Sequence, residues 1–320
     1  MTKNIKKIAK TIIRANSIAL FTHISPDCDA LGSVFALYYT LTEMGKTVSI
    51  YSKDKFANVE NLLFDECVVQ KKVCDSNKYD LFISCDAPAL FRLGEYAEVF
   101  KEKANSIVID HHQNGGLLGK FNYINKSRSS CCELVLEILE AMKVKISSQV
   151  ASKLYAGLSS DTNSFANSNT NEQTFNSALK LMRAGAEIGY INECLYQSRT
   201  RKSIEFKKFL WNNAKIKGDC AYCVISNQEL KELKGNKEDC VGFSRSLISI
   251  QGVNYSFSII EEAPGIFNVS LRSKIGYDVL TKAEKLGGGG HLCASGAKIQ
   301  AKSINEAKKM VLSTFKEVCQ

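Results

Sequence analysis

Long apolar runs are missing from this chain of 320 residues, and their absence argues against a membrane-spanning helix. Such a helix needs about 20 consecutive apolar residues. The N-terminal stretch MTKNIKKIAKTIIRANSIAL instead places lysines between its isoleucines, at the spacing of an amphipathic helix, and carries no secretory pattern. We therefore expect a soluble protein of the cytoplasm.

Paired cysteine motifs are scarce, although the chain has 12 cysteines. They are scattered, and several fall in apolar runs such as LFISCDA, so we expect reduced thiols rather than a disulfide framework. Cys220 and Cys223 form a C-x-x-C, but DCAYCVI has the pattern of a strand and no second pair lies at zinc-finger spacing. Zinc or redox chemistry there is the less favoured interpretation.

Internal repeats and low-complexity segments are absent too, and the 45% apolar content suits two globular domains. The net charge is +9, from lysines and arginines spread along the chain. Residues 206–320 hold 17 lysines and arginines against 11 acidic residues, so six of the nine excess charges belong to this part. A basic chain suits a polyanionic substrate without requiring one.

The first half of the chain alternates apolar strand patterns with helical patterns. Strands are predicted in the stretches SIALFTHI, TVSIYS, ECVVQ, YDLFISCD and NSIVIDHH, and helices at about 31–44 and 89–103. Continuous apolar strands separated by helices indicate an α/β domain with a parallel sheet and helices on both faces. Ligands of such sheets bind beyond the carboxyl ends of the strands.

A helical block follows. Ser130 with Glu133 and Thr170 with Gln173 have the spacing of capping boxes, and Gly185 is expected to end the second of these helices. Another helix is expected at about 149–158, before the polar loop SSDTNSF.

The pattern changes again near Phe206. The strand-like segments AYCVIS, NYSFSII and FNVSLRS alternate with turns, and a last helix is expected at about 303–318. We expect a first domain at 1–190, a linker at 191–205 and a smaller, mixed α/β domain at 206–320.

Histidine is rare, with four residues in the chain, and the positions of three of them are informative. His23 follows the first predicted strand, and the pair His111 and His112 follows the last strand of the first half. Aspartates lie at the same strand ends or in the loop SSDTNSF, namely Asp27, Asp29, Asp86, Asp110 and Asp161. Because the carboxyl ends of parallel strands meet at one edge of a sheet, these side chains are expected to converge.

Each of these residues also has a structural interpretation. Asp27 and Asp29 could form a turn or cap the helix that follows them. Asp86 could cap a helix, Asp161 could make a local turn, and the histidine pair could be an exposed turn. Taken together they favour a metal site, because independent turn-formers need not converge on one edge of a sheet.

Carboxylates and imidazoles from separate loops suit divalent ions such as manganese, with no thiolate needed. Several aspartates in one place repel one another unless cations neutralise them. Two metals about 3.5–4 Å apart can share a carboxylate, hold a bridging hydroxide and stabilise the entering and leaving oxygens at phosphorus. The pattern therefore predicts a dimetal centre for phosphate-ester hydrolysis.

Four glycines, residues 287–290, precede the remaining histidine. On its own this run could be a flexible linker. With a histidine after it and the arginine of VSLRS before it, the run is better interpreted as a phosphate cradle of exposed backbone amides beside two cationic donors. The predicted substrate-binding residues are Arg245, Arg272, Gly288, Gly289, Gly290 and His291.

The order of these motifs resembles the DHH phosphoesterases, and specifically the NrnA-like branch, which pairs a DHH domain with a DHH-associated domain. The motifs are HISPDCDALGS, CDAPALFRLG, IDHHQN, GLSSDTNSF, VSLRS and GGGGHLCASGA, and the resemblance spans about residues 5–318. Members of this branch are manganese-dependent hydrolases of very short RNA and often also remove the 3′-phosphate of adenosine 3′,5′-bisphosphate (pAp). The resemblance implies that oligoribonucleotides of two to five nucleotides are degraded to mononucleotides and that pAp is converted to AMP.

The same resemblance assigns roles to residues. The ligands implied for one metal are His23, Asp27 and Asp86. Those implied for the other metal are Asp29, Asp86, His111 and Asp161, with Asp86 bridging. Asp110 would orient the histidines, His112 would give a hydrogen bond or a proton at the scissile phosphate, and Arg92 would contact a phosphate oxygen.

Cys28 departs from the family pattern, which usually has glycine between the first two aspartates. A side chain there could alter the turn or bring a thiol near the metals. Rival activities on the same fold are a linear dinucleotide (pApA) phosphodiesterase, a dedicated pAp phosphatase, and a pyrophosphatase or exopolyphosphatase, although relatives of the last pair carry a different C-terminal domain. A non-catalytic nucleotide-binding protein would be expected to lose metal ligands, and all are present here. The resemblance also suggests a homodimer.

Overall fold

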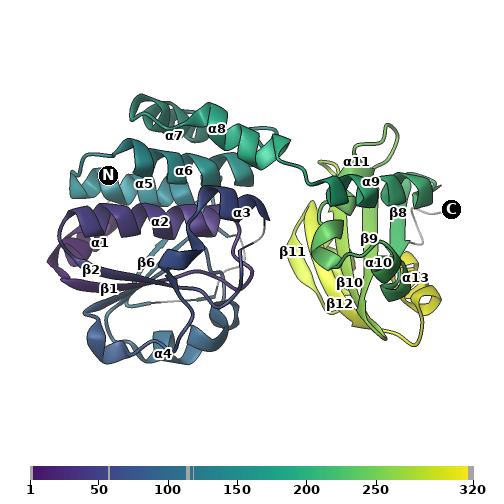
Figure 1. The fold of residues 1–320 in the computed structure, drawn as a ribbon, viewed down its shortest axis with the longest axis horizontal. Coiled ribbons are helices and arrows are strands. Elements are labelled where there is room, and N and C mark those ends of the chain that lie inside the picture. The colour runs from purple at the N-terminus through teal and green to yellow at the C-terminus, as the bar shows by residue number, and fades with distance from the viewer. Residues whose placement is uncertain (1–2, 57, 113–115, 118, 316–320) are drawn as a thin grey trace. The chain divides into compact units, whose positions relative to one another are not determined.

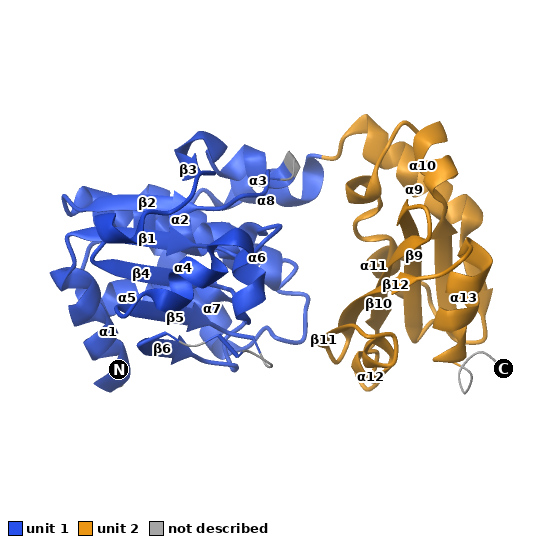
Figure 2. Ribbon diagram, turned by 90° about the horizontal axis from the view of Figure 1, so that it is seen from below, with its two compact units in different colours: residues 1–198 blue, residues 199–320 orange. Residues whose placement is uncertain are grey.

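The structure, a computed structural model, describes residues 3–56, 58–112, 116–117 and 119–315. The chain divides into two compact units, unit 1 (Met1–Ser198) and unit 2 (Arg199–Gln320), which Figure 2 shows in different colours. Each unit has its own sheet and its own hydrophobic core. No helix in the described part of the chain is both long enough and apolar enough to cross a membrane.

Unit 1 is built on a six-stranded sheet in the order β3-β2-β1-β4-β5-β6. Its neighbouring strands run parallel. The strands are β1 (Ser17–Phe21), β2 (Thr47–Tyr51), β3 (Val69–Gln70), β4 (Leu81–Cys85), β5 (Ser106–Asp110) and β6 (Phe121–Ile124). The parallel α/β fold expected from the alternating patterns is therefore confirmed.

Helices cover both faces of this sheet because successive side chains of a strand point to opposite faces. In β1, Ile18 and Leu20 belong to the core on the face that four helices cover. Those helices are α1 (Lys3–Arg14), α2 (Cys28–Glu43), α5 (Cys131–Met142) and α6 (Ser148–Asp161). Phe21 points the other way and packs its ring 5.6 Å from that of Phe100 in α4 (Ala97–Glu102). Figure 1 shows α4 on the opposite side of the sheet from α2.

The remaining helices of unit 1 are α3 (Asn58–Leu63), α7 (Glu172–Arg183) and α8 (Ile188–Asn192). Ser130 caps α5, as predicted, but the capping box of α7 is formed by Asn171 and Thr174, one residue later than the predicted pair. Asparagine is as good a cap as threonine, and its side chain accepts hydrogen bonds from the amides of Gln173 and Thr174. Gly185 follows α7 with φ of 90°, a helix end of the predicted kind.

The segment 191–205, expected to be a linker, is mostly helical. Helix α8 continues into a π-helical turn over Glu193–Gln197, and α9 (Arg201–Asn213) begins within the same segment. The side chain of Thr200 caps α9 by accepting a hydrogen bond from the amide of Ser203. A threonine cap favours the start of a helix even in a polar segment whose composition predicts a linker.

Unit 2 has a second six-stranded sheet, in the order β11-β12-β10-β9-β8-β7. Its strands are β7 (Lys215–Lys217), β8 (Cys220–Ile225), β9 (Tyr255–Ala263), β10 (Ile266–Ser273), β11 (Gly289–His291) and β12 (Ala294–Gln300). Strands β8 and β9 are parallel, and the other pairs are antiparallel. The expected mixed α/β fold is confirmed.

Five helices pack on the two faces of this second sheet. Helices α12 (Leu280–Glu284) and α13 (Ile304–Ser313) share a core with one face. Helices α9, α10 (Asn227–Glu232) and α11 (Phe243–Ile248) share a core with the other. The last helix, expected to reach residue 318, ends at Ser313, and residues 316–320 lie outside the described part of the chain.

Candidate dimetal centre

The carboxyl edge of the unit 1 sheet gathers the residues that the sequence pattern singles out. His23 follows β1, Asp86 follows β4, and Asp110, His111 and His112 end or follow β5. Since β1, β4 and β5 are neighbours in the sheet, these side chains are brought to one place.

Two helices bring three more aspartates to this edge. Asp27 caps α2 and Asp29 lies in its first turn, while Asp161 is the last residue of α6. Asp27 does serve as a cap, because its Oδ1 accepts hydrogen bonds from the amides of Asp29 and Ala30, both at 3.0 Å. The capping role and a ligand role are compatible, because a carboxylate has two oxygens.

The acidic and histidine side chains of the described residues form three groups, in each of which the ligand atoms lie within 4.8 Å of one another. The first group is His23, Asp27 and Asp86, with Nε2 of His23 3.9 Å and 3.6 Å from the two carboxylates. The second group is Asp29, His111 and Asp161, with Nε2 of His111 3.6 Å and 3.4 Å from the two carboxylates. These are the residues expected to hold two metals.

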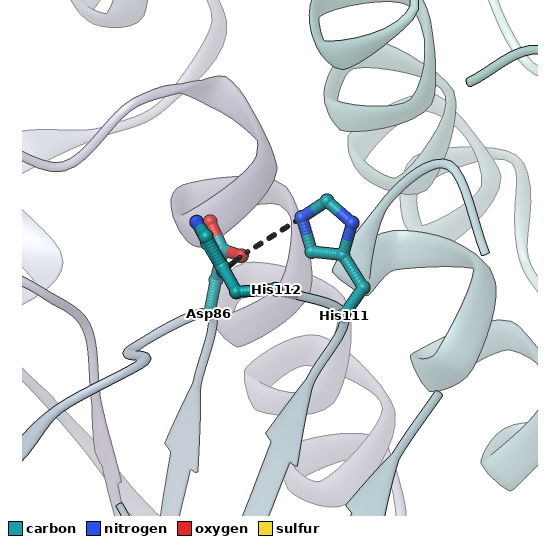
Figure 3. A group of neighbouring side chains, drawn as sticks. All are labelled: Asp86, His111 and His112. Carbon is teal, nitrogen blue, oxygen red and sulfur yellow. Dashed lines mark ion pairs between the residues drawn. The ribbon is translucent and has the colours of Figure 1, made fainter. Parts of the chain in front are cut away.

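Asp86 belongs to the first group and also forms the third group, with His111 and His112. Its Oδ2 faces Nε2 of His23, and its Oδ1 lies 3.3 Å from Nε2 of His111 and 3.5 Å from Nδ1 of His112 (Figure 3). Asp86 is 2% exposed, and its Oδ1 has no well-aligned hydrogen-bond donor among the described residues. Its φ of 59° is a strained value for a residue with a side chain, of the kind that is kept at functional sites. Asp86 therefore fits a bridging ligand.

Backbone carbonyls orient the imidazoles of His23 and His111. Nδ1 of His23 lies 2.8 Å from the carbonyl oxygen of Ile24, and Nδ1 of His111 lies 3.3 Å from that of Arg128. An imidazole that donates its Nδ1–H to a carbonyl has the lone pair of Nε2 available for a metal. The sequence does not predict that Arg128 orients His111, because the contact is made by a backbone carbonyl, which every residue has.

Arg128 is itself held by acidic side chains of α5. Its guanidinium lies 2.5 Å from the carboxylate of Glu137 and 3.9 Å from that of Glu133. Glu133 is 1% exposed, accepts a hydrogen bond from the hydroxyl of Ser129 at 2.7 Å, and has its pKa raised by burial. These contacts fix the carbonyl that orients His111.

The electrostatics of the centre favour bound cations. Burial, and repulsion from Asp86, raise the pKa of Asp29 to about 7, and burial raises that of Asp161 well above its usual value. Burial lowers the pKa of His23, but its bond to Asp86 and the charge of Asp27 outweigh this and raise it to about 9. Buried carboxylates that take up protons in this way are the groups that a divalent ion would neutralise.

His112 and Asp110 form a separate pair beside Asp86. Nδ1 of His112 lies 2.8 Å from Oδ1 of Asp110, which is 1% exposed. Asp110 thus orients His112, whereas His111 is oriented by a carbonyl. Arg92 lies at the same edge, with Nη2 3.0 Å from Nδ1 of His23.

Cys28 is accommodated without entering either ligand group. Its side chain is buried, and its Sγ lies 3.7 Å from Oε1 of Glu60. Burial raises the pKa of this thiol well above its usual value, so it stays protonated. The metal-ligand groups found among the described residues do not include it.

In unit 2, strand register aligns two predicted substrate-binding residues, and a helix brings a third beside them. Arg272 of β10 pairs with Ala294 of β12, which pairs with His291 of β11. Directly opposed residues point to the same face of a sheet, so Arg272 and His291 share a face. Arg245 of α11 covers that face, and burial together with its positive charge lowers the pKa of Arg272 to about 10. Two cations held this close suit an anionic ligand.

The glycine run 287–290 is not a free linker, since Gly289 and Gly290 begin the edge strand β11. A Cβ at Gly288 would lie 2.1 Å from the carbonyl oxygen of Gly296, and one at Gly290 would lie 2.6 Å from that of Ala294. Gly290 also has φ of 142°. Glycine is therefore required at both positions for the strand to pair, and Gly289 faces open space.

Two family models match the chain. The DHH family N-terminal domain matches residues 17–158, and the DHHA1 domain matches residues 219–317. The chain therefore carries a DHH domain followed by a DHHA1 domain.

Individual relatives extend over nearly the whole chain. It is 29% identical over 305 residues to the bifunctional oligoribonuclease and PAP phosphatase NrnA of Mycoplasma genitalium, covering 93% of each chain. It is 27% identical over 320 residues to the protein of that name from Bacillus subtilis, covering 98% of each. An exopolyphosphatase-related protein from Bacteroides fragilis shares its fold, with a TM-score of 0.90 and 24% identity over 100% of this chain and 99% of the other.

Proposed function

We propose that this protein is a metal-dependent phosphoesterase that hydrolyses RNA of two to five nucleotides to mononucleotides and removes the 3′-phosphate of pAp to give AMP. The observation that carries the proposal is the position of Asp86, a buried carboxylate that contacts both His23 and His111 and whose Oδ1 has no well-aligned hydrogen-bond donor among the described residues. The names of the NrnA relatives, which align over more than nine-tenths of this chain, support the choice of substrates.

Manganese suits the donor set, which consists of carboxylates and imidazoles. One ion would be held by His23, Asp27 and Asp86. The other would be held by Asp29, Asp86, His111 and Asp161. Bound there, the metals would supply an activated water and neutralise charge on the phosphate.

His112 would act on the substrate as a donor. Burial lowers its pKa, but the bond to Asp110 and the charge of Asp86 outweigh this and raise it above the usual value. A histidine that keeps its proton can donate a hydrogen bond to a phosphate oxygen or a proton to the leaving oxygen. Arg92, with a guanidinium at the same edge, would stabilise negative charge that develops on the phosphoryl group.

Unit 2 would bind the terminal phosphate and base of the substrate. Arg272, Arg245 and His291 would face the phosphate, with Gly288, Gly289 and Gly290 beside them. The amide of Gly288 donates to the carbonyl of Ala283 at 2.8 Å and would not itself bind the phosphate. A cradle that binds the terminal phosphate would make the end of the substrate, rather than an internal linkage, its point of attachment. We expect long RNA to be a poor substrate.

The test is Mn²⁺-dependent product release from equal concentrations of a diribonucleotide, a 24-residue RNA, pAp, pApA and pyrophosphate. Asp86→Asn and Asp86→Ala serve as inactive controls, and asparagine tolerates the positive φ of this position. We expect fast hydrolysis of the diribonucleotide and pAp, lost in both variants. Turnover confined to pAp, to pApA, to pyrophosphate or to long RNA would overturn the proposal, as would nucleotide binding without turnover.

A further inference from the structure

Helix α1 carries a line of positive charge that the proposed chemistry does not use. We call its five basic residues the basic stripe, and all are exposed: Lys3, Lys6, Lys7, Lys10 and Arg14. Their spacings of three and four residues place them along one side of the helix. The opposite side is buried in the core of unit 1 through Ile5, Ile8, Ala9 and Ile12. The helix contains no acidic residue.

This arrangement opposes helix stability. Lys3 and Lys7, Lys6 and Lys10, and Lys10 and Arg14 are like charges four residues apart, which destabilise a helix by about 0.2–0.5 kcal/mol for each pair. Lysines in the first turn also oppose the helix dipole. An anion bound along the stripe would relieve both effects.

Neighbouring acids do not neutralise the stripe. None of the ion pairs between described residues includes a stripe residue. On α5, which packs against α1, Glu137 is paired with Arg128 at 2.5 Å and Glu140 with Lys180 at 2.7 Å. The stripe charges therefore face solvent.

The basic surface continues onto the edge strand β6. Nζ of Lys7 lies 4.8 Å from the centre of the Phe121 ring, and Nζ of Lys120 lies 5.6 Å from it. Asn4 fixes the helix to the strand by donating a hydrogen bond to the carbonyl of Asn122 at 2.8 Å. Figure 2 shows α1 beside β6 at this side of unit 1. The surface combines several cations with a half-buried aromatic ring.

We propose that this surface binds the phosphate backbone of single-stranded RNA that is longer than the substrate, without cleaving it. From Lys3 to Arg14 the helix rises about 16 Å, which is room for several phosphates. Arg14 lies just before the amino end of β1, whereas the metal ligands lie beyond its carboxyl end. The stripe would therefore hold the enzyme on RNA from which short fragments arise. The choice of RNA as the anion rests on the proposed function.

Two other occupants fit the surface less well. The apolar side of α1 is buried in the core, so the helix has no free face to insert into a lipid bilayer. A second copy of the chain would bring like charges together in a symmetric contact, which costs free energy.

The test compares a stripe variant with a variant of equal net charge. In the stripe variant Lys3, Lys6, Lys7 and Lys10 are replaced by Gln. In the control, Gln replaces four exposed lysines elsewhere that form no ion pair with a described acid: Lys72, Lys101, Lys231 and Lys309. Both lower the net charge from +9 to +5 by four substitutions.

Binding of a labelled 24-residue single-stranded RNA is followed by fluorescence anisotropy over a salt series, with strand integrity checked on a gel. Four phosphate contacts add about −3 to the slope of log K against log salt, or about 50-fold in affinity between 50 and 200 mM. We expect the stripe variant to lose this salt dependence and to bind at least about tenfold more weakly at low salt, while the control changes by about twofold at most. Equal binding by the two variants would overturn the inference.

Three further measurements distinguish RNA from the other possible occupants of this surface and test the catalytic proposal separately. Stripe-dependent binding to vesicles of anionic lipid without binding to the RNA would overturn the inference in favour of a membrane surface. Stripe-dependent dimerisation in sedimentation, again without RNA binding, would overturn it in favour of a second copy. Diribonucleotide hydrolysis, measured in parallel, should be unchanged in both variants. If the unmodified protein did not hydrolyse the diribonucleotide, the proposed function would be wrong, and the comparison of RNA binding by the two variants would still hold.

Discussion

In unit 1 three of the side chains at the sheet edge, His23, Asp29 and Asp86, are almost fully buried, at 5%, 1% and 2% exposure, whereas in unit 2 Arg245 and His291 are exposed. The first group concentrates negative charge. The second concentrates positive charge.

The two units differ in how they offset the repulsion between like charges. Buried carboxylates need protons, imidazoles or metals as partners, because burial disfavours an isolated charge. In unit 1 residues from separate strands and helices supply these partners. In unit 2 the strand register places Arg272 and His291 on one face, and α11 brings Arg245 near Arg272, whose pKa is lowered by burial and by that second charge. We expect changes in unit 1 to act on metal binding and changes in unit 2 to act on substrate affinity.

The largest expected effect is that of Asp86→Asn, which removes the charge between the two ligand groups. Turnover of the diribonucleotide should fall by at least about 10³-fold, because dimetal charge stabilisation contributes several kcal/mol to the transition state. Titration calorimetry should show the loss of at least one Mn²⁺ site. Two intact sites with normal affinity would show that Asp86 is not a bridging ligand.

Arg272→Gln should leave both metal sites intact and weaken substrate binding. A charge-assisted hydrogen bond contributes about 1.5–3 kcal/mol, so KM for pAp should rise by about 10- to 100-fold with a smaller change in kcat. Arg272→Lys keeps the charge but not the planar guanidinium. Its KM for pAp should lie between those of the unmodified protein and Arg272→Gln. If Arg272→Gln lowered the Mn²⁺ affinity and left KM unchanged, the division into metal binding by unit 1 and substrate binding by unit 2 would be wrong.

Glu133→Gln tests whether the carbonyl of Arg128 positions His111. The substitution removes the buried carboxylate beside Arg128, which should make the Arg128 carbonyl more mobile. Mn²⁺ affinity should then fall by about tenfold, the lower end of the range for residues that orient metal ligands. Glu140→Gln, in a surface pair with Lys180 on the same helix, is the matched control and should leave Mn²⁺ affinity unchanged. Equal Mn²⁺ affinities in the two variants would assign Glu133 to folding alone.

The smallest expected effect concerns stability in unit 2. Burial opposes ionisation of Glu262, but hydrogen bonds from Lys298, Lys237 and Asn268 prevail and lower its pKa to about 2. A lowered pKa in the folded state adds stability above the pKa of the unfolded chain, and this contribution is lost as the pH falls from about 4.5 towards 2.

Glu262→Gln should therefore cost about 1 kcal/mol of unfolding free energy at neutral pH and little near pH 2. Denaturant titrations at several pH values measure this difference. A cost that stays constant with pH would point to lost packing rather than lost charge.

Much of the fold was predictable because strand and helix patterns are local. Side chains alternate along a strand and repeat every three to four residues along a helix, so apolar stretches of unit 1 indicate a parallel sheet with covered faces. The convergence of His23, Asp86 and His111 follows from that fold. The start of α7 was misplaced by one residue, because neighbouring threonine and asparagine are both good caps and local pattern does not choose between them.

Which residue types reach the edge of the first sheet could be predicted from the sequence, because that depends on where each strand ends. How these residues pair depends on the order of the strands in the folded sheets. Asp86 lies between both ligand groups because β4 is flanked by β1 and β5, and Arg272 shares a face with His291 because β12 pairs with both their strands. Such pairings join residues far apart in the chain, and their free energy comes from the packed sheet as a whole rather than from any local pattern.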